Sequence, residues 1–561
     1  MNKTLKSTLA IAALLCTHVP RARACGCFAP PTPATPVVQA GERILFAKDG
    51  KDVTAYIQLQ YQGAAADFGW LVPLPSVPTL ETGTDELFTQ LLASTSPSYV
   101  LSTTRDYCGG GSSTSVGCGG GASDVTSAGT FNSVDAGASA GASASSPVVV
   151  QASIGPYDYA VLKADDKNAM LGWLSANHYY VPDATGTAVT PYIHPGAYFL
   201  ALKLASGESA GNVVPIVLRY ESDLPMVPIT LTQVGAIPDM GVLVWLLGDA
   251  RAIPRNYYHV VLDDLPVWND VSSYPAAAIR AVHEAPKRHG ILTEYAGPSA
   301  VMANRLDYPG RFGDLTQLRT LSNPYDYLTF LRSYGFSYTS TLLALLQKYD
   351  PEPASLVAQG ITPAQYCSSY YAYQTPDATD GGTSPFDPAA LTDAIEAAVV
   401  TPARRASTLF SSHPYLTRMY TALSPEDMNV DPVFSQNPDL PEVPLLHTAQ
   451  LTYPCEGDAW LATESGTKAQ FVSGVLRTST ALPGALRIET LREAGAPQVV
   501  TDHAAAIKAS LGSVSEGSSS DSTSHGAGSG CDVRNHFPRS AAGTGLLVVA
   551  AMWLARRRRL V

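Results

Sequence analysis

Basic residues are scarce in this sequence, and their scarcity excludes one class of partner. Lys and Arg number 36 against 48 Asp and Glu in 561 residues, which gives a formal net charge of −12. The cluster Arg556 to Arg559 holds several of the basic residues, so the rest of the chain is more acidic still. Binding to nucleic acid depends on clustered Lys and Arg that displace counterions from phosphates. We therefore predict no nucleic-acid partner.

The common metal-binding patterns are also missing. No Cys-x-x-Cys pair or nearby histidine accompanies the cysteines between the two ends of the chain. After His283-Glu284 the next histidine is His289, so the zinc-protease pattern of two histidines four positions apart is absent. The acidic pairs Asp165-Asp166 and Asp263-Asp264 lack the glycine-containing loop of a calcium site. We predict no metal, no cofactor and no catalytic residue.

The N-terminus has the features of a secretion signal. Positive residues precede the apolar run Leu9 to Cys16, and Ala22 and Ala24 supply the small residues that a signal peptidase needs. We expect residues 1–24 to be removed, which leaves Cys25 as the first residue. Acylation of Cys25, as in a lipoprotein, is the alternative.

No apolar run reaches the ~20 residues of a comfortable membrane span. The longest candidate, Ala541 to Ala555, is shorter and is followed at once by Arg556 to Arg559, which fixes the cytoplasmic side. With the preceding Cys531 it resembles the myxobacterial C-terminal sorting tag, over residues 531–561. The resemblance implies processing at Cys531, and a plain transmembrane anchor is the alternative. The expected partners are the membrane, through this segment, and the export and sorting machinery.

Six cysteines lie between the predicted signal and the tail. An exported protein meets an oxidising compartment, where an even number of cysteines favours disulfides. We expect one disulfide to close the Gly/Ser-rich loop, and the pairing of the remaining cysteines stays open. The six are Cys25, Cys27, Cys108, Cys118, Cys367 and Cys455, with Cys108 and Cys118 flanking the loop.

Hydrophobic patterns predict an α+β fold. Val53 to Tyr61 alternates in polarity, as a half-buried strand does. Asp85 to Leu92 and Asp165 to Asn177 have helical spacing. Further strands are expected at Phe68 to Val72, Val148 to Ile154, Tyr198 to Leu204, Val213 to Tyr220, Met226 to Leu231 and Val242 to Leu247. The turn residues between them favour an antiparallel sheet.

The second half of the chain changes to helical periodicity. We expect helices at Tyr325 to Tyr334, Ser340 to Tyr349, Pro388 to Val400 and Ala403 to Leu416. The predicted order is a signal peptide (1–24), an antiparallel β-rich domain (25–108 and 147–300), a flexible Gly/Ser/Ala insertion (109–146), a mainly α-helical domain (301–512), a linker (513–530) and a tail (531–561) with a short transmembrane helix (541–555).

Four short motifs resemble one bacterial family. They are Cys25-Gly26-Cys27-Phe28, Phe68-Gly69-Trp70-Leu71-Val72-Pro73-Leu74-Pro75, Gly155-Pro156-Tyr157-Asp158 and Thr293-Glu294-Tyr295. Together they resemble the bacterial domain of unknown function 2330, from about Cys25 to Ser299. The resemblance implies an exported bacterial protein of no established activity, and it carries over no functional residue.

The sequence predicts an exported cell-envelope or surface protein with a binding or structural role and unknown biochemical activity. Trp70, Trp173 and Trp245 lie in apolar segments, so we expect them in the core; an exposed binding platform is the alternative. The rival function is an envelope hydrolase assembled from distant residues, for example His194, His259 and Asp263-Asp264. A pocket in which a nucleophile, a histidine and an acid converge would favour the hydrolase.

Overall fold

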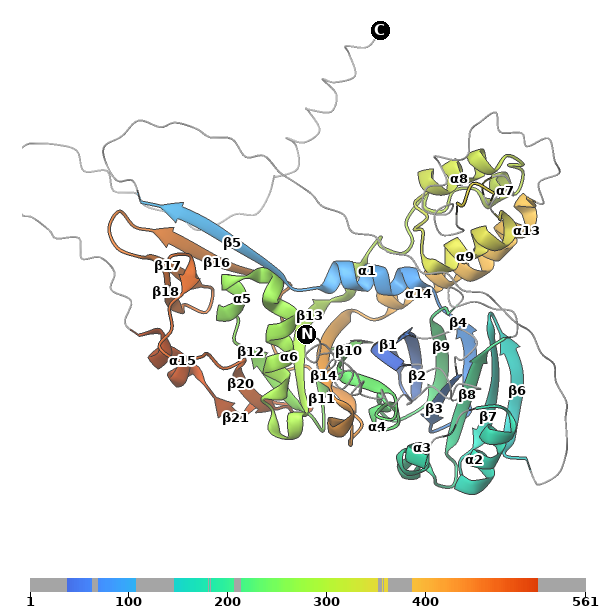
Figure 1. The fold of residues 1–561 in the computed structure, drawn as a ribbon, viewed down its shortest axis with the longest axis horizontal. Coiled ribbons are helices and arrows are strands. Elements are labelled where there is room, and N and C mark those ends of the chain that lie inside the picture. The colour runs from blue at the N-terminus through green and yellow to red at the C-terminus, as the bar shows by residue number, and fades with distance from the viewer. Residues whose placement is uncertain are drawn as a thin grey trace, which may run out of the picture. The chain divides into compact units, whose positions relative to one another are not determined.

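A computed structural model gives the fold of this protein (Figure 1). The described residues are 38–62, 69–106, 146–179, 181, 183–205, 213–351, 356, 358–361 and 386–512. The predicted signal with Ala22 and Ala24, almost all of the insertion 109–146 and the tail with Cys531 lie outside these ranges. Among the described residues, no helix is long and apolar enough to cross a membrane.

The largest sheet has ten strands in the order β21-β20-β12-β13-β14-β10-β1-β2-β9-β4. Two neighbouring pairs, β1 with β10 and β12 with β13, are parallel. The strands are β1 (Val38–Asp49), β2 (Asp52–Gln62), β4 (Thr79–Thr82), β9 (Ile216–Glu221), β10 (Ala236–Gly248), β12 (Tyr258–Leu262), β13 (Gly290–Pro298), β14 (Tyr415–Leu423), β20 (Ala485–Thr490) and β21 (Gln498–Asp502).

The expectation of an antiparallel sheet is therefore wrong at β10. The turn residues around this strand suggested hairpins, but its neighbours are β1 and β14, which lie far away in the sequence. Parallel strands need a long crossover connection, and the many residues between β1 and β10 supply one. The fold is a mixed α+β fold.

Strands from the second half of the chain complete this sheet. β14 lies between β10 and β13, and β20 and β21 form one edge. The expected mainly helical region 301–512 has helices up to Ser412, and its described residues after that form strands β14 to β21, one α-helix and one short helical turn. A short apolar run such as Tyr415–Leu423 does not distinguish a buried strand from a buried helix by its periodicity, which explains the error.

Three smaller sheets accompany the large one. A four-stranded sheet has the order β3-β8-β7-β6, a five-stranded sheet the order β19-β18-β17-β16-β5, and β11 pairs with β15. Their strands are β3 (Gly69–Leu74), β5 (Ser98–Arg105), β6 (Val148–Ile154), β7 (Tyr157–Lys163), β8 (Tyr198–Leu204), β11 (Arg251–Pro254), β15 (Phe434–Asn437), β16 (Leu446–Tyr453), β17 (Ala459–Thr463), β18 (Lys468–Val472) and β19 (Val475–Leu476).

The helices are mostly short. The α-helices are α1 (Asp85–Thr95), α2 (Lys167–Ala176), α3 (Asp183–Ala188), α4 (Ile229–Thr232), α5 (Leu265–Asn269), α6 (Tyr274–His283), α7 (Leu315–Leu318), α8 (Pro324–Ser333), α9 (Ser340–Tyr349), α13 (Pro388–Ile395), α14 (Thr401–Ser412) and α15 (Ala504–Leu511). Other helical turns are η2 (Thr190–Tyr192), η4 (Val271–Ser273), η5 (Pro286–Arg288), η6 (Ser299–Met302), η7 (Glu396–Val400) and η8 (Pro425–Asp427).

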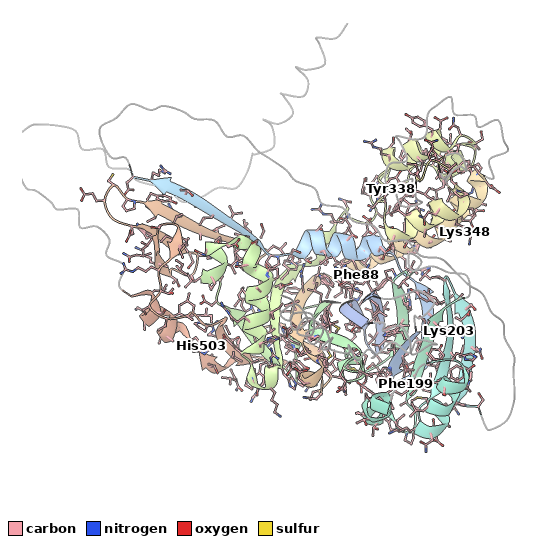
Figure 2. The ribbon with its side chains drawn as sticks, viewed as in Figure 1. Phe88, Phe199, Lys203, Tyr338, Lys348 and His503 are labelled. Carbon is pink, nitrogen blue, oxygen red and sulfur yellow. The ribbon has the colours of Figure 1, made fainter. Side chains whose placement is uncertain are left out.

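Alternate side chains of the ten-stranded sheet enter two different cores. On β1, Ile44 and Phe46 pack toward the four-stranded sheet, whereas Leu45 packs with α14 and with Phe88 of α1. Figure 2 labels Phe88. On β2, Val53, Ala55, Ile57 and Leu59 are buried as predicted, but Tyr56 is buried on the opposite face. A layer of structure lies on each side of this strand, so both of its faces are covered. A separate core joins α7, α8, α9 and α13.

Candidate functional site

An apolar pocket of about 170 Å³ lies between the ten-stranded sheet and the four-stranded sheet. Strands β1, β2 and β9 of the ten-stranded sheet form one wall, and β3 and β8 form the other. Its lining includes Phe46, Ile57 and Leu218 from the first wall and Trp70 and Val72 from the second. An apolar cavity with a few polar groups is the usual form of a small-molecule site.

The motif Phe68 to Pro75 builds the second wall. Gly69 to Leu74 of this motif form β3 and are all buried. The strand continues through Pro73 although proline cannot donate a ladder hydrogen bond. The sheet order explains this tolerance, because among the described strands β3 is an edge strand that pairs only with β8. Alternation then turns Trp70, Val72 and Leu74 to the face that meets the ten-stranded sheet.

Trp70, which lines this pocket, has an unused hydrogen-bond donor. Its side chain is 1% exposed, and its Nε1–H has no acceptor within the described part of the chain. A buried donor without an acceptor costs about 1–3 kcal/mol. A ligand that offers an acceptor atom to Nε1 would recover that free energy.

Polar contacts fix one end of the pocket. Tyr192 donates from its hydroxyl to Oδ2 of Asp431 at 2.6 Å, and the backbone N–H of Thr230 donates to Oδ1 of the same carboxylate at 2.8 Å. Burial raises the pKa of Asp431. These contacts hold α4, which forms where the sequence predicted a strand from Met226 to Leu231. Burial also raises the pKa of the pocket residue Tyr220, so its phenol is neutral.

The residues proposed for a hydrolase do not form one site. His194 is exposed and lines the apolar pocket. His259 is buried on β12, where Nδ1 lies 3.1 Å from Oε2 of Glu489 and Nε2 lies 3.3 Å from an Arg251 guanidinium nitrogen. Burial lowers the pKa of His259. Neither of these partners offers a hydroxyl or thiol nucleophile.

The acidic pair Asp263-Asp264 makes local contacts. Asp263 accepts a hydrogen bond from the backbone N–H of Leu265, and Asp264 accepts one from Nε1 of Trp268 at 3.2 Å. Burial raises the pKa of Asp263 to about 6. Within the described residues, no group of three or more His, Cys, Asp or Glu side chains is placed to hold a metal ion.

Sequence reasoning missed a buried ion pair in the motif Thr293-Glu294-Tyr295. Oε2 of Glu294 lies 2.5 Å from Nε of Arg418, and the hydroxyl of Tyr274 donates to Oε1 at 2.5 Å. Arg418 also donates to the hydroxyl of Ser96 at 2.9 Å. The partner could not be found from the sequence because Arg418 comes from β14, a strand predicted there as part of a helical region.

The three tryptophans Trp70, Trp173 and Trp245 differ in burial. Trp70 and Trp245 are buried, as predicted, and Nε1 of Trp245 donates to the hydroxyl of Thr95. Trp173 is half-buried at the end of α2, where it lines a second pocket.

Cys455 is disulfide-bonded. The other five cysteines of the predicted set, Cys25, Cys27, Cys108, Cys118 and Cys367, lie outside the described residues.

The fold and the pocket define a mixed α+β protein built on a ten-stranded sheet. Residues 19–338 match the family model DUF2330, described as an uncharacterized protein conserved in bacteria. The chain belongs to this family, and the match extends beyond the predicted end at Ser299. No curated protein and no solved structure matched the chain.

Proposed function

We propose that this protein is exported to the cell envelope and binds a small, mainly apolar ligand in the pocket between the sheets. The observation that carries the proposal is Trp70, which lines an apolar cavity and whose buried Nε1–H has no acceptor within the described residues. An enzymatic role has less support, since His259 is paired with Glu489 and Arg251 away from the pocket.

The size of the cavity limits the ligand. An apolar cavity of roughly 150 Å³ holds a benzene molecule, and this pocket measures about 170 Å³. The expected ligand, or the buried end of a longer one, is a single ring or a short acyl chain with one acceptor oxygen. That oxygen would accept from Nε1 of Trp70.

Location in the envelope is supported by three features. The N-terminal residues have the pattern of a secretion signal, and Cys455 is disulfide-bonded, which is typical of oxidising compartments. The tail after Cys531 has the pattern of a sorting or anchor segment. We expect the membrane to hold the protein through residues 541–555 at least until the sorting machinery acts.

Toluene and benzaldehyde test the pocket because they share a ring and differ in an acceptor oxygen. The native protein should bind benzaldehyde roughly fivefold more tightly, as expected for a hydrogen bond worth ~1 kcal/mol. Trp70→Phe should abolish this preference, whereas Trp460→Phe, outside the pocket, should keep it. Binding is measured by NMR titration.

The indole N–H resonance of Trp70 in the native protein provides a check that needs no variant. Benzaldehyde should move it further downfield than toluene does, because only benzaldehyde can accept a hydrogen bond from Nε1. Equal affinity of the native protein for both compounds would contradict a role for the Trp70 donor.

A further inference from the structure

A second pocket, of about 260 Å³, lies on the other face of the four-stranded sheet. Strands β6, β7 and β8 form its floor, and the end of α2 forms its wall. Figure 2 labels Lys203 on β8, which lines this pocket. The apolar pocket uses the opposite face of the same sheet, so the two pockets are independent.

The floor of the second pocket is polar. Ser153, Asp158 and Lys203 lie opposite one another on adjacent strands. Ser153 donates from Oγ to Oδ1 of Asp158 at 2.5 Å. Lys203 is half-buried, and no ion pair or hydrogen bond of its ammonium group is found among the described residues. The floor therefore presents donors from Lys203 beside acceptors from Asp158.

Aromatic rings form the wall. The rings of Trp173 and Tyr179 have centroids 6.1 Å apart, and Nζ of Lys203 lies 5.9 Å from the centroid of Tyr179. Asn177 donates from Nδ2 to the carbonyl of Trp173 at 2.8 Å, and its Oδ1 is an acceptor. Polar groups on one side and aromatic surface on the other thus line the same cavity.

A helix C-cap holds the wall in place. The N–H of Tyr179 donates to the carbonyl of Leu174 at 2.9 Å, and the N–H of His178 donates to that of Ser175 at 3.3 Å. These two bonds form a Schellman motif, with His178 in the left-handed conformation at φ 63°. The motif turns the chain back so that Tyr179 is buried against the sheet.

We propose that this second pocket binds a carbohydrate. A sugar has an apolar C–H face, which suits the negative face of an aromatic ring, and hydroxyls that both donate and accept. The carboxylate of Asp158 balances Lys203, which disfavours a phosphate or another anion. A purely apolar ligand would leave the Asp158 and Lys203 charges without partners, at a cost in free energy.

Neutral trisaccharides test the proposal with the intact mature protein. Cellotriose, maltotriose and chitotriose are used as probes, with inorganic phosphate as the anionic alternative. Saturation-transfer NMR should show contact with at least one trisaccharide, and calorimetry should give its affinity. Lys203→Met should weaken that affinity about tenfold, the scale of a lost hydrogen bond to a charged group. Trp173→Leu should also weaken it, because it removes an aromatic face against which the sugar packs.

Lys163→Met is the matched control. Lys163 is exposed on β7, and it does not line the pocket, so sugar affinity should not change. Failure of all three trisaccharides to bind the native protein would overturn the proposal, as would binding of phosphate alone or unchanged affinity in Lys203→Met. Benzaldehyde binding in the other pocket should be the same in all these variants, so the two proposals can fail separately.

Discussion

Glu294 and Arg418 join distant parts of the chain through one buried contact. Their side chains are 3% and 6% exposed, and their charged atoms lie 2.5 Å apart. Tyr274 of α6 and Ser96, which follows α1, add hydrogen bonds to the pair. Glu294 belongs to a motif that resembles the family, so this motif has a structural explanation and need not mark an active site.

Glu294→Gln should destabilise the protein strongly. The amide keeps the shape of the side chain but leaves the buried guanidinium of Arg418 without its counter-charge, which costs about 3–5 kcal/mol. Urea unfolding of the mature protein measures the change. Glu493→Gln is the control, because Glu493 forms an exposed pair with Arg255 and its loss should cost under ~1 kcal/mol. Equal effects of the two substitutions would show that the Glu294 pair does not stabilise the fold.

At the scale of elements, the position of a strand in its sheet and the capping of a helix explain features that local propensity does not predict. β3 tolerates Pro73 because it is an edge strand of its sheet. The alternation of side chains along the strand places Trp70 on the face that lines the apolar pocket. α2 begins at the side chain of Asp166, which accepts from the N–H groups of Asn168 and Ala169. The helix ends at the left-handed His178.

His178→Gly should stabilise the protein. The left-handed conformation costs a non-glycine residue roughly 1 kcal/mol, and glycine would remove this cost. The greater backbone entropy of unfolded glycine would offset part of that gain. The expected net gain is about 0.5 kcal/mol, measured as a higher urea midpoint. Ser175→Gly, exposed within the same helix, should instead cost roughly 0.5–1 kcal/mol. A lower midpoint for His178→Gly would contradict the explanation.

For the whole molecule, we expect the tail after Cys531 to decide where the protein resides. Carrying the cluster Arg556 to Arg559 through the bilayer would cost several kcal/mol for each charge, so export should stop there. The polar linker 513–530 would let a processing enzyme reach Cys531. We therefore expect the mature protein to end near Cys531 and to reach the outer envelope.

Cys531→Ala should leave an unprocessed protein in the inner membrane. Mass spectrometry of fractionated membranes would then find the C-terminal arginines in the variant and not in the native protein. Ser540→Ala, a small change in the same tail, should be processed normally. Recovery of Arg556 to Arg559 from the mature native protein would favour the plain anchor.

Much of the local structure followed from the sequence alone. The predicted helix Ser340 to Tyr349 has these bounds in the structure, and so do the strands Val148 to Ile154 and Tyr198 to Leu204. The alternation from Val53 to Tyr61 identified the face of β2 that enters the core between the sheets. These features depend on neighbours in sequence, whose periodicity reports which side of an element is apolar. The family resemblance likewise rested on short contiguous motifs.

Only the tertiary structure decided which strands are neighbours and where the pockets lie. The parallel pairing of β1 with β10 and the place of β14 between β10 and β13 join segments far apart in the chain. Such pairings depend on packing of whole faces, which no local pattern records. Trp70 was predicted to be a core residue, and it is one; that it also lines a cavity could be seen only when β3 was placed against β1, β2 and β9.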